Sequence, residues 1–221
     1  MQKLSPFVPS RFFPSVECCN DDGLLVMGGK LTPEILLDAY AHGIFPWPID
    51  ESSPMLWWSP DPRTVFDLEN VHFSRRLLRT CRSGRFTVTF DTDFEGVIRN
   101  CATAHGSTWI LPAMIKGYVR LHKLGWAHSV ETWYENRLVG GVYGVAMGGL
   151  FAGESMFHTM ADASKVALYF LVERLRQRGY TLFDIQMTTS HTERFGAIEI
   201  PRDEYLTRLA KALAQDCHFV D

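Results

Sequence analysis

The chain has 221 residues, of which 46% are hydrophobic and 21% are charged, and its formal net charge is −3 at pH 7. These values are typical of a globular protein with a large core, and they exclude a disordered chain. The sequence has no run of 18 apolar residues and no apolar signal segment, and its five scattered cysteines form no C-x-x-C motif. We therefore expect a cytoplasmic protein without a membrane span, a disulfide framework or a metal site.

The first 60 residues are rich in proline and contain one clear helix signal. Residues 32–43, "TPEILLDAYAHG", begin with a threonine suited to the N-cap and a proline at the first helical position, and they end at a glycine. Trp47, Trp57 and Trp58 follow within twelve residues. They predict either a packed loop or a surface for stacking.

Residues 70–90 contain five arginines and no acidic residue. Arg75, Arg79 and Arg82 recur at the spacing of one helical face, and Arg76 lies beside them. A basic face on an otherwise acidic protein suits a polyanion, because attraction is local and repulsion acts elsewhere. The alternative is an ordinary solvated helix face.

From about residue 62, strands and helices alternate. Residues 85–91 predict a half-buried strand, residues 92–95 a capping box that opens a helix, and residues 111–125 an amphipathic helix that ends at Gly125. An antiparallel meander over residues 127–155, with turns at "EN" and "GG", comes next.

The C-terminal third predicts a long helix over residues 162–179, a strand at 181–186 and a helix at 201–213. This order is typical of a GNAT-like acyltransferase, an α+β fold in which two strands of a mixed central sheet splay apart. The segment before the long helix lacks the glycines that would cradle the pyrophosphate of coenzyme A. No cofactor is therefore expected.

The strand "TLFDIQ" has two polar residues in a buried setting. Alternation places Asp184 and Gln186 on one face and Phe183 and Ile185 on the other. A carboxylate removed from water needs a partner or a function. The six residues alone favour a structural Asp–Gln hydrogen bond, and a catalytic pair is the alternative.

Several unusual strings between residues 13 and 205 resemble, in one consistent order, the bacterial leucyl/phenylalanyl-tRNA–protein transferases. They include "DGLL", "GIFPW", "WWSPDPRTVF", "HGSTWI", "GESMF" and "FDIQ". The resemblance implies a small N-terminal domain, residues 1–61, joined to a GNAT-like domain, residues 62–221. It also implies transfer of Leu or Phe from an aminoacyl-tRNA to the N-terminal Arg or Lys of a protein, which creates a degradation signal. Met is expected as a poorer donor.

The resemblance assigns residues to this reaction. Asp184 and Gln186 form the catalytic pair, with Asp184 accepting a hydrogen bond from the Gln186 amide, and Glu154 holds the amino group or ribose of the substrate. Trp47 and Trp109 flank the terminal adenosine of the tRNA. The pocket for the transferred side chain is lined by Val142, Phe151, Met156, Leu171 and Phe183. The basic face of Arg75, Arg76, Arg79 and Arg82 then binds the tRNA backbone.

The residues are consistent with this chemistry. Aminoacyl-tRNA is an activated ester, and the sequence has neither a P-loop nor a nucleophile elbow. Positioning amine and ester together is worth roughly 7–11 kcal/mol. Two alternatives remain: another tRNA-dependent GNAT-fold acyltransferase, such as a peptidoglycan cross-bridge enzyme, and a noncatalytic RNA-binding module.

Overall fold

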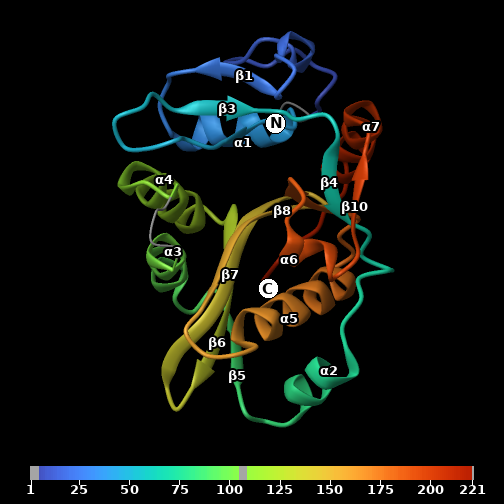
Figure 1. Ribbon diagram of the computed structural model, residues 1–221. Helices are drawn as coiled ribbons and strands as arrows, with labels where there is room; N and C mark the ends of the chain where they lie inside the picture. Colours follow the sequence, from blue (N-terminus) through green and yellow to red (C-terminus); the bar gives the residue numbers. More distant parts are fainter. Residues whose placement is uncertain (1–4, 105–108, 221) are drawn as a thin grey trace.

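The computed structural model describes residues 5–104 and 109–220, and its strands form two separate sheets (Figure 1). Within these residues, the smaller sheet has three strands in the order β1-β3-β2, and the larger has seven in the order β10-β4-β9-β8-β7-β6-β5. The smaller sheet lies at one end of the molecule, at the top of Figure 1.

The small sheet is built from the proline-rich N-terminal segment. Its elements are η1 (Val16–Cys18), β1 (Leu24–Met27), α1 (Pro33–Ala41), β2 (Phe45–Pro46) and β3 (Leu56–Trp58). Helix α1 is the predicted one: the Thr32 hydroxyl accepts from the backbone N–H of Ile35, and Gly43 follows the helix with φ +73°.

The large sheet and its helices take up the rest of the chain. In order, the elements are β4 (Arg63–Phe66), α2 (Arg75–Arg82), β5 (Thr87–Phe90), α3 (Phe94–Thr103), α4 (Pro112–Lys123), β6 (Ala127–Tyr134), β7 (Arg137–Met147), β8 (Leu150–His158), α5 (Ala163–Gln177), β9 (Leu182–Gln186), α6 (Ser190–Glu193), β10 (Ala197–Ile200) and α7 (Arg202–Leu213).

The local signals of this region predicted most of its elements but not β4, α6 or β10, and one prediction needs correction. The meander β6–β7–β8, the long helix α5 and the closing helix α7 are confirmed. The predicted capping box at residues 92–95 is wrong by one residue. Asp93 caps α3, because its carboxylate accepts from the backbone N–H of Gly96.

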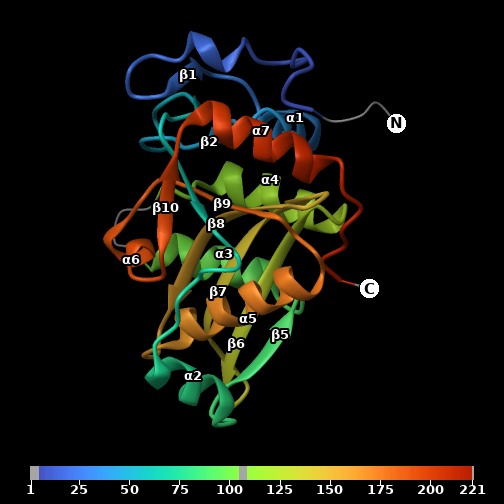
Figure 2. The same cartoon turned by 90° about the vertical axis from the view of Figure 1, so that its right-hand side faces the viewer.

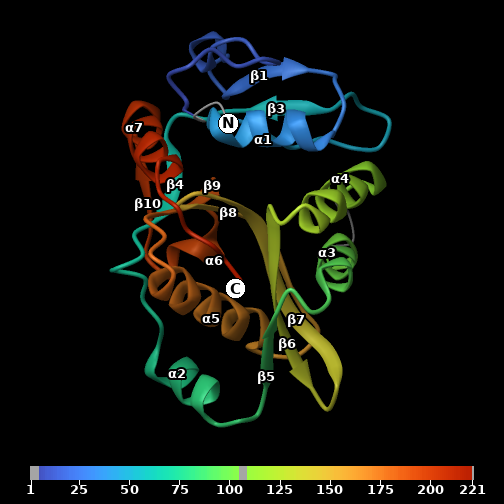
Figure 3. The ribbon, with the colours of Figure 1, turned by 180° about the vertical axis from the view of Figure 1, so that it is seen from behind.

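Helices cover both faces of the large sheet (Figures 1 and 3). Helices α3 and α4 lie on one face, and α5 lies on the other with α2 packed beside it. Helix α7 contacts β8 and β9, and in Figure 2 it runs close to α1 and the small sheet. One core cluster joins α1 to α3, α4 and α7, and a second lies under α5. Among the described residues, no helix is long and apolar enough to cross a membrane.

The parallel strands β8 and β9 separate in the middle of the sheet. They pair through Leu150↔Leu182, Phe151↔Phe183 and Ala152↔Asp184. Beyond these pairs β8 continues along β7, whereas β9 continues along β4. The strand order and this splay confirm the predicted GNAT-like α+β fold, and the opening lies where Glu154 and Gln186 extend the two strands.

Candidate active site

A buried ion pair joins β4 to β9 beside the opening. Arg63 donates from Nε to Oδ1 of Asp184 at 2.9 Å and from Nη2 to Oδ2 at 2.7 Å, and the two residues are 1% and 0% exposed. The remaining Nη1 donates to the carbonyl of Gly43, and the guanidinium lies between the rings of Phe45 and Tyr205. A buried charge pair is tolerated when its other hydrogen-bonding sites are also occupied.

Asp184 makes two further contacts that complete its coordination. The hydroxyl of Tyr205 donates to Oδ2 at 2.9 Å, and the backbone N–H of Gln186 donates to Oδ1 at 2.9 Å. The four contacts fall two on each oxygen, so the carboxylate fixes the ends of β4, β9 and α7 relative to one another.

The backbone of β9 changes course immediately after Asp184. Against Val65 and Thr64 of β4, strand β9 steps from Asp184 to Gln186, so Ile185 is an additional residue, a β-bulge. Gln186 adopts φ +61°, a left-handed conformation that is uncommon for a non-glycine residue and is concentrated at functional sites.

The bulge overturns two expectations about this strand. Ile185 and Gln186 both line the cavities described below, so the predicted alternation of Ile185 and Gln186 is wrong. Asp184 accepts from the backbone N–H of Gln186 and not from its side-chain amide. That amide, through Nε2, donates instead to Oε1 of Glu154 at 3.3 Å.

Glu154 of β8 lies in a cluster of phenol hydroxyls. The Tyr40 hydroxyl of α1 bonds to Oε1 at 2.7 Å, the Tyr118 hydroxyl of α4 bonds to Oε2 at 2.9 Å, and the two hydroxyls bond to each other. The two phenol protons serve two of these three bonds, so all three form together when the carboxyl itself carries a proton. Burial raises the pKa of Glu154 to about 7, and the nearby Asp184 charge adds to this, although the tyrosine hydrogen bonds and Arg63 act in the opposite direction. Burial also raises the pKa of both tyrosines, which keeps their hydroxyls protonated.

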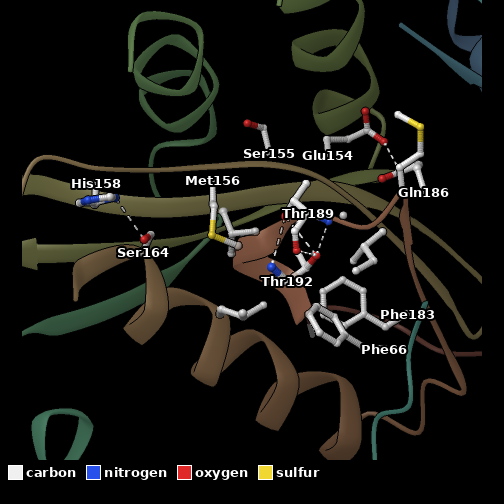
Figure 4. A pocket seen from close by; sticks show the side chains of 15 residues that line it. Phe66, Glu154, Ser155, Met156, His158, Ser164, Phe183, Gln186, Thr189 and Thr192 are labelled. Carbon is white, nitrogen blue, oxygen red and sulfur yellow. Dashed lines mark hydrogen bonds between the residues drawn. The ribbon is translucent and has the colours of Figure 1, made fainter. Parts of the chain in front are cut away.

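Two cavities meet at Glu154 and Gln186. The first, about 460 Å³, lies in the opening between β8 and β9 (Figure 4). One side of it is apolar, and the residues forming that side include Phe66, Val142, Met156, Leu168 and Phe183. Its polar residues include Ser155, His158, Ser164, Thr189 and Thr192.

The second cavity is smaller, about 220 Å³, and is lined by aromatic residues of the N-terminal segment together with Trp109. Trp47 and Trp109 lie with ring centroids 5.9 Å apart and planes tilted by 54°. The loop that carries Trp47 is fixed by Trp58, whose Nε1 donates to the Trp47 carbonyl. The wall shared by the two cavities is formed by Glu154, Ile185, Gln186, Met187 and Thr189.

The five residues predicted to line a side-chain pocket form two layers. Val142, Met156 and Phe183 line the first cavity directly. Phe151 and Leu171 are buried in the core behind them, and Phe151 packs edge-on against Phe183. Phe219, near the C-terminus, stacks on the far side of Phe151.

The four predicted tRNA-contacting arginines lie far from the cavities along the molecule. All four are exposed on α2, which the three ribbon views place at the end opposite the small sheet. Of the string "HGSTWI", residues 105–108 fall outside the described part, and Trp109 and Ile110 are within it.

Sequence reasoning missed Arg63, Tyr40 and Tyr118. A usable signal existed for Arg63, because a buried aspartate requires a cation and Arg63 is the one basic residue of "WWSPDPRTVF". The tyrosines occupy apolar positions of helices α1 and α4, where the pattern predicts only core packing.

The sequence is similar to one family of known proteins over most of its length. A family model described as leucyl/phenylalanyl-tRNA protein transferase matches residues 65–210, and a model of that family's N-terminal domain matches residues 29–61. The leucyl/phenylalanyl-tRNA–protein transferase of Nitratidesulfovibrio vulgaris (strain DP4) is 54% identical over 207 residues, which cover 92% of this chain and 88% of that protein.

A second relative is equally similar to this chain, whereas the solved structures share only low sequence identity with it. The transferase of the same name from Anaeromyxobacter sp. (strain Fw109-5) is 54% identical over 205 residues, covering 91% of this chain and 87% of that protein. Among solved structures, the crystal structure of FemX has a TM-score of 0.44 at 11% identity, with 80% of this chain and 65% of that chain covered.

Proposed function

The chain belongs to the leucyl/phenylalanyl-tRNA protein transferase family, and we propose that Glu154 and Gln186 carry out the transfer at the wall between the two cavities. The enzyme is an aminoacyltransferase that moves Leu or Phe from tRNA to a protein. The observation that supports these two roles is that both side chains border an apolar cavity on one side and the tryptophan cavity on the other.

In this proposal the aminoacyl-tRNA end spans both cavities. The Leu or Phe side chain occupies the first cavity, against Val142, Met156 and Phe183, and an unbranched Met adapts to either shape. The terminal adenosine stacks in the second cavity against Trp47 and Trp109, where stacking is worth about 1–3 kcal/mol per base. The ester that joins the two groups then lies beside Glu154 and Gln186.

The reaction forms a bond between the acceptor's α-amino nitrogen and the ester carbonyl carbon, and it breaks the bond from that carbon to the ribose oxygen. The amine has an unperturbed pKa of about 7.7–8.0, so it must lose a proton to attack. Glu154, with its pKa raised to about 7, accepts that proton. The nitrogen gives up a second proton as the amide forms, and this proton passes to the ribose oxygen as the carbon–oxygen bond breaks. Glu154 returns the first proton to water, and the hydroxyls of Tyr40 and Tyr118 bond to its carboxylate.

Gln186 positions the attacking amine and Asp184 positions Gln186. The Gln186 Nε2 group is directed to Glu154, so the amide oxygen is available to accept a hydrogen bond from the amine. Asp184 acts through the backbone, holding the bulge by accepting from the Gln186 N–H. Arg63 holds Asp184 in turn, which makes the ion pair a support for the site.

The same proposal includes the N-terminal residue of the acceptor, the order of the donors and the contacts to the tRNA backbone. The acceptor carries N-terminal Arg or Lys and the product is a degradation signal, as the family resemblance implies. Met is a poorer donor than Leu or Phe. Arg75, Arg76, Arg79 and Arg82 attract the tRNA backbone, supported by their exposure on one helix. Because aminoacyl-tRNA is made in the cytoplasm, the enzyme acts there.

A division into residues 1–61 and 62–221 is also proposed. It is supported by the small sheet, whose strands end at Trp58, and by the large sheet, whose chain begins with Arg63. The family models match residues 29–61 and 65–210 separately.

The decisive experiment supplies the protein with tRNA charged with labelled Phe and a peptide that begins with Arg. Label on the peptide is expected, and a matched peptide that begins with Glu should remain unlabelled. A peptidoglycan cross-bridge enzyme would label a nucleotide-sugar peptide instead, and a noncatalytic RNA-binding module would retain the tRNA without transfer.

A further inference from the structure

Residues of α3 and α4 line a cationic groove. Figures 1 and 3 show these two helices on the face of the large sheet away from α2 and α5. Its volume is about 850 Å³. The charged residues that line it are Glu95 and Arg99 from α3 and Lys116, Arg120 and Lys123 from α4. The transfer chemistry described above uses none of them.

The α4 side of the groove concentrates positive charge. Lys116, Arg120 and Lys123 recur at i, i+4 and i+7, so they share one helical face, and all three are exposed. Helix α4 contains no acidic residue. Over residues 5–104 and 109–220, no carboxylate oxygen lies within ion-pair distance of these three side chains. The pKa of Glu34 on α1 is nevertheless lowered, by its backbone hydrogen bond and in smaller part by the positive charge of Arg120.

The α3 side is different, because its cation is already paired. Arg99 bonds to Glu95 at 2.6 Å, so the two charges largely cancel. The free charge of the groove therefore comes from α4. On a protein whose formal net charge is −3, such a local excess attracts an anion with several charges at regular spacing.

The groove begins close to the tryptophan cavity. Trp109 lines that cavity, and Pro112, three residues later, begins α4 and lines the groove. Three residues span at most about 11 Å. Helix α4 also contacts α1, which places it at the small-sheet end of the molecule. The arginines of α2 lie at the opposite end.

We propose that Lys116, Arg120 and Lys123 bind phosphates of the tRNA acceptor stem next to the aminoacyl end. This inference rests on the proposed placement of the adenosine against Trp47 and Trp109. Because α4 begins within about 11 Å of Trp109, a stem attached to an adenosine in that cavity comes within reach of α4. A paired RNA stem is recognised through its phosphates and shape. The α2 arginines then meet a more distant part of the same tRNA.

The test compares two double variants that each remove two exposed cations. Arg120→Ala/Lys123→Ala changes the groove, and Arg137→Ala/Lys211→Ala changes β7 and α7 elsewhere on the surface. Affinity for Phe-tRNA and for a charged acceptor-stem minihelix is measured between 0.1 and 1 M salt. Each lost phosphate contact flattens the slope of log affinity against log salt by about 0.9 or less.

The groove variant should flatten the slope by up to about 1.8 on both RNAs. The loss of affinity at 0.1 M salt should then be about tens-fold, and it should vanish near 1 M. The control variant should match the wild type. An unchanged slope for the groove variant overturns the proposal. A change on full-length tRNA without one on the minihelix also overturns it, because the contact would then lie outside the acceptor stem.

Two further experiments distinguish this proposal from a failure of the proposed function and from binding to a membrane surface. Phenylalanyl-adenosine, a donor with no stem, should be used equally by the wild type and both variants. If the wild type fails with this donor and with Phe-tRNA, the proposed function fails, whatever the salt slopes show. Binding to vesicles rich in anionic lipid, lost in the groove variant while its tRNA affinity is unchanged, would assign the groove to a membrane surface and overturn the acceptor-stem assignment.

Discussion

Two carboxylates on neighbouring strands, Asp184 and Glu154, have opposite environments. Asp184 is enclosed by Arg63, Tyr205 and the Gln186 backbone, and its four contacts are all protein groups. Glu154 accepts from two neutral phenols and the Gln186 amide, and it faces both cavities. Asp184 is held as an anion by its ion pair, so it supports the structure. Glu154 has only neutral hydrogen-bond donors and borders the cavities, so it can exchange a proton with a substrate.

The largest effect should come from removing the enclosed carboxylate. Asp184→Ala leaves Arg63 buried without its anion, which should lower the free energy of unfolding by about 3–5 kcal/mol. Urea denaturation followed by circular dichroism measures this. The control is Glu95→Ala, which breaks the exposed pair with Arg99 and should cost about 0–1 kcal/mol. Equal losses in the two variants would mean that the buried pair does not support the fold.

In contrast to Asp184→Ala, Glu154→Gln should slow transfer while leaving the stability of the fold nearly unchanged. The glutamine still accepts hydrogen bonds but cannot take a proton, so single-turnover transfer from bound Phe-tRNA should slow by about 10²-fold. Thermal unfolding should stay near that of the wild type. Glu131→Gln is the matched control, since Glu131 is a buried glutamate of β6 that accepts hydrogen bonds from Ser129 of the same strand and Thr89 of β5. A normal rate in Glu154→Gln would contradict proton transfer by this residue.

The pKa of Glu154, raised to about 7, predicts two opposite pH effects. The transfer rate should rise about tenfold between pH 6 and 8 as the carboxyl loses its proton, beyond the rise caused by the amine itself. Stability should do the reverse. The unfolded chain loses this proton first, near its ordinary pKa of 4.5, so the stability contributed by the protonated group is complete below pH 4.5 and is lost as pH rises through 7. Both effects should be absent from Glu154→Gln, and their persistence there would assign them to another group.

Gln186→Ala should have an intermediate effect on turnover. The variant loses one hydrogen bond to the attacking amine, for which about tenfold slower transfer is expected. The affinity for Phe-tRNA should be unchanged, because the side chain contacts the acceptor. The backbone N–H that bonds to Asp184 is retained, so the free energy of unfolding should differ little. A large loss of stability would instead make Gln186 a structural residue.

The smallest effect concerns which amino acid is transferred. Met156→Ala enlarges the first cavity and should raise transfer from Trp-tRNA relative to Leu-tRNA several-fold, since such cavities discriminate by about 1–3 kcal/mol per misplaced methylene. Phe151→Leu, which changes the buried layer behind Phe183, should leave that ratio unchanged while lowering stability. An equal shift in the ratio for both variants would place Phe151 among the residues that select the donor.

The sequence by itself predicted the longer helices and strands and their order, but not the strands of the small sheet, β4, α6 or β10. A threonine cap and a glycine mark the ends of α1, and Gly125 follows the end of α4. The alternating apolar pattern with two turns predicted the meander. These signals act between residues a few positions apart, so the sequence alone shows them. The unusual strings around Glu154 and Asp184 are also sufficient to indicate the family.

The tertiary structure alone decided which side chains meet. Arg63 reaches Asp184 across 121 residues of sequence, and Tyr40 reaches Glu154 across 114. Because of the bulge at Ile185, the Gln186 side chain bonds to Glu154 and not to Asp184. No residue type in "FDIQ" predicts a bulge. The alternation of side chains holds only for a regular strand. Strand β9 is irregular where it pairs with β4 and separates from β8, and these tertiary contacts decide which way its side chains point.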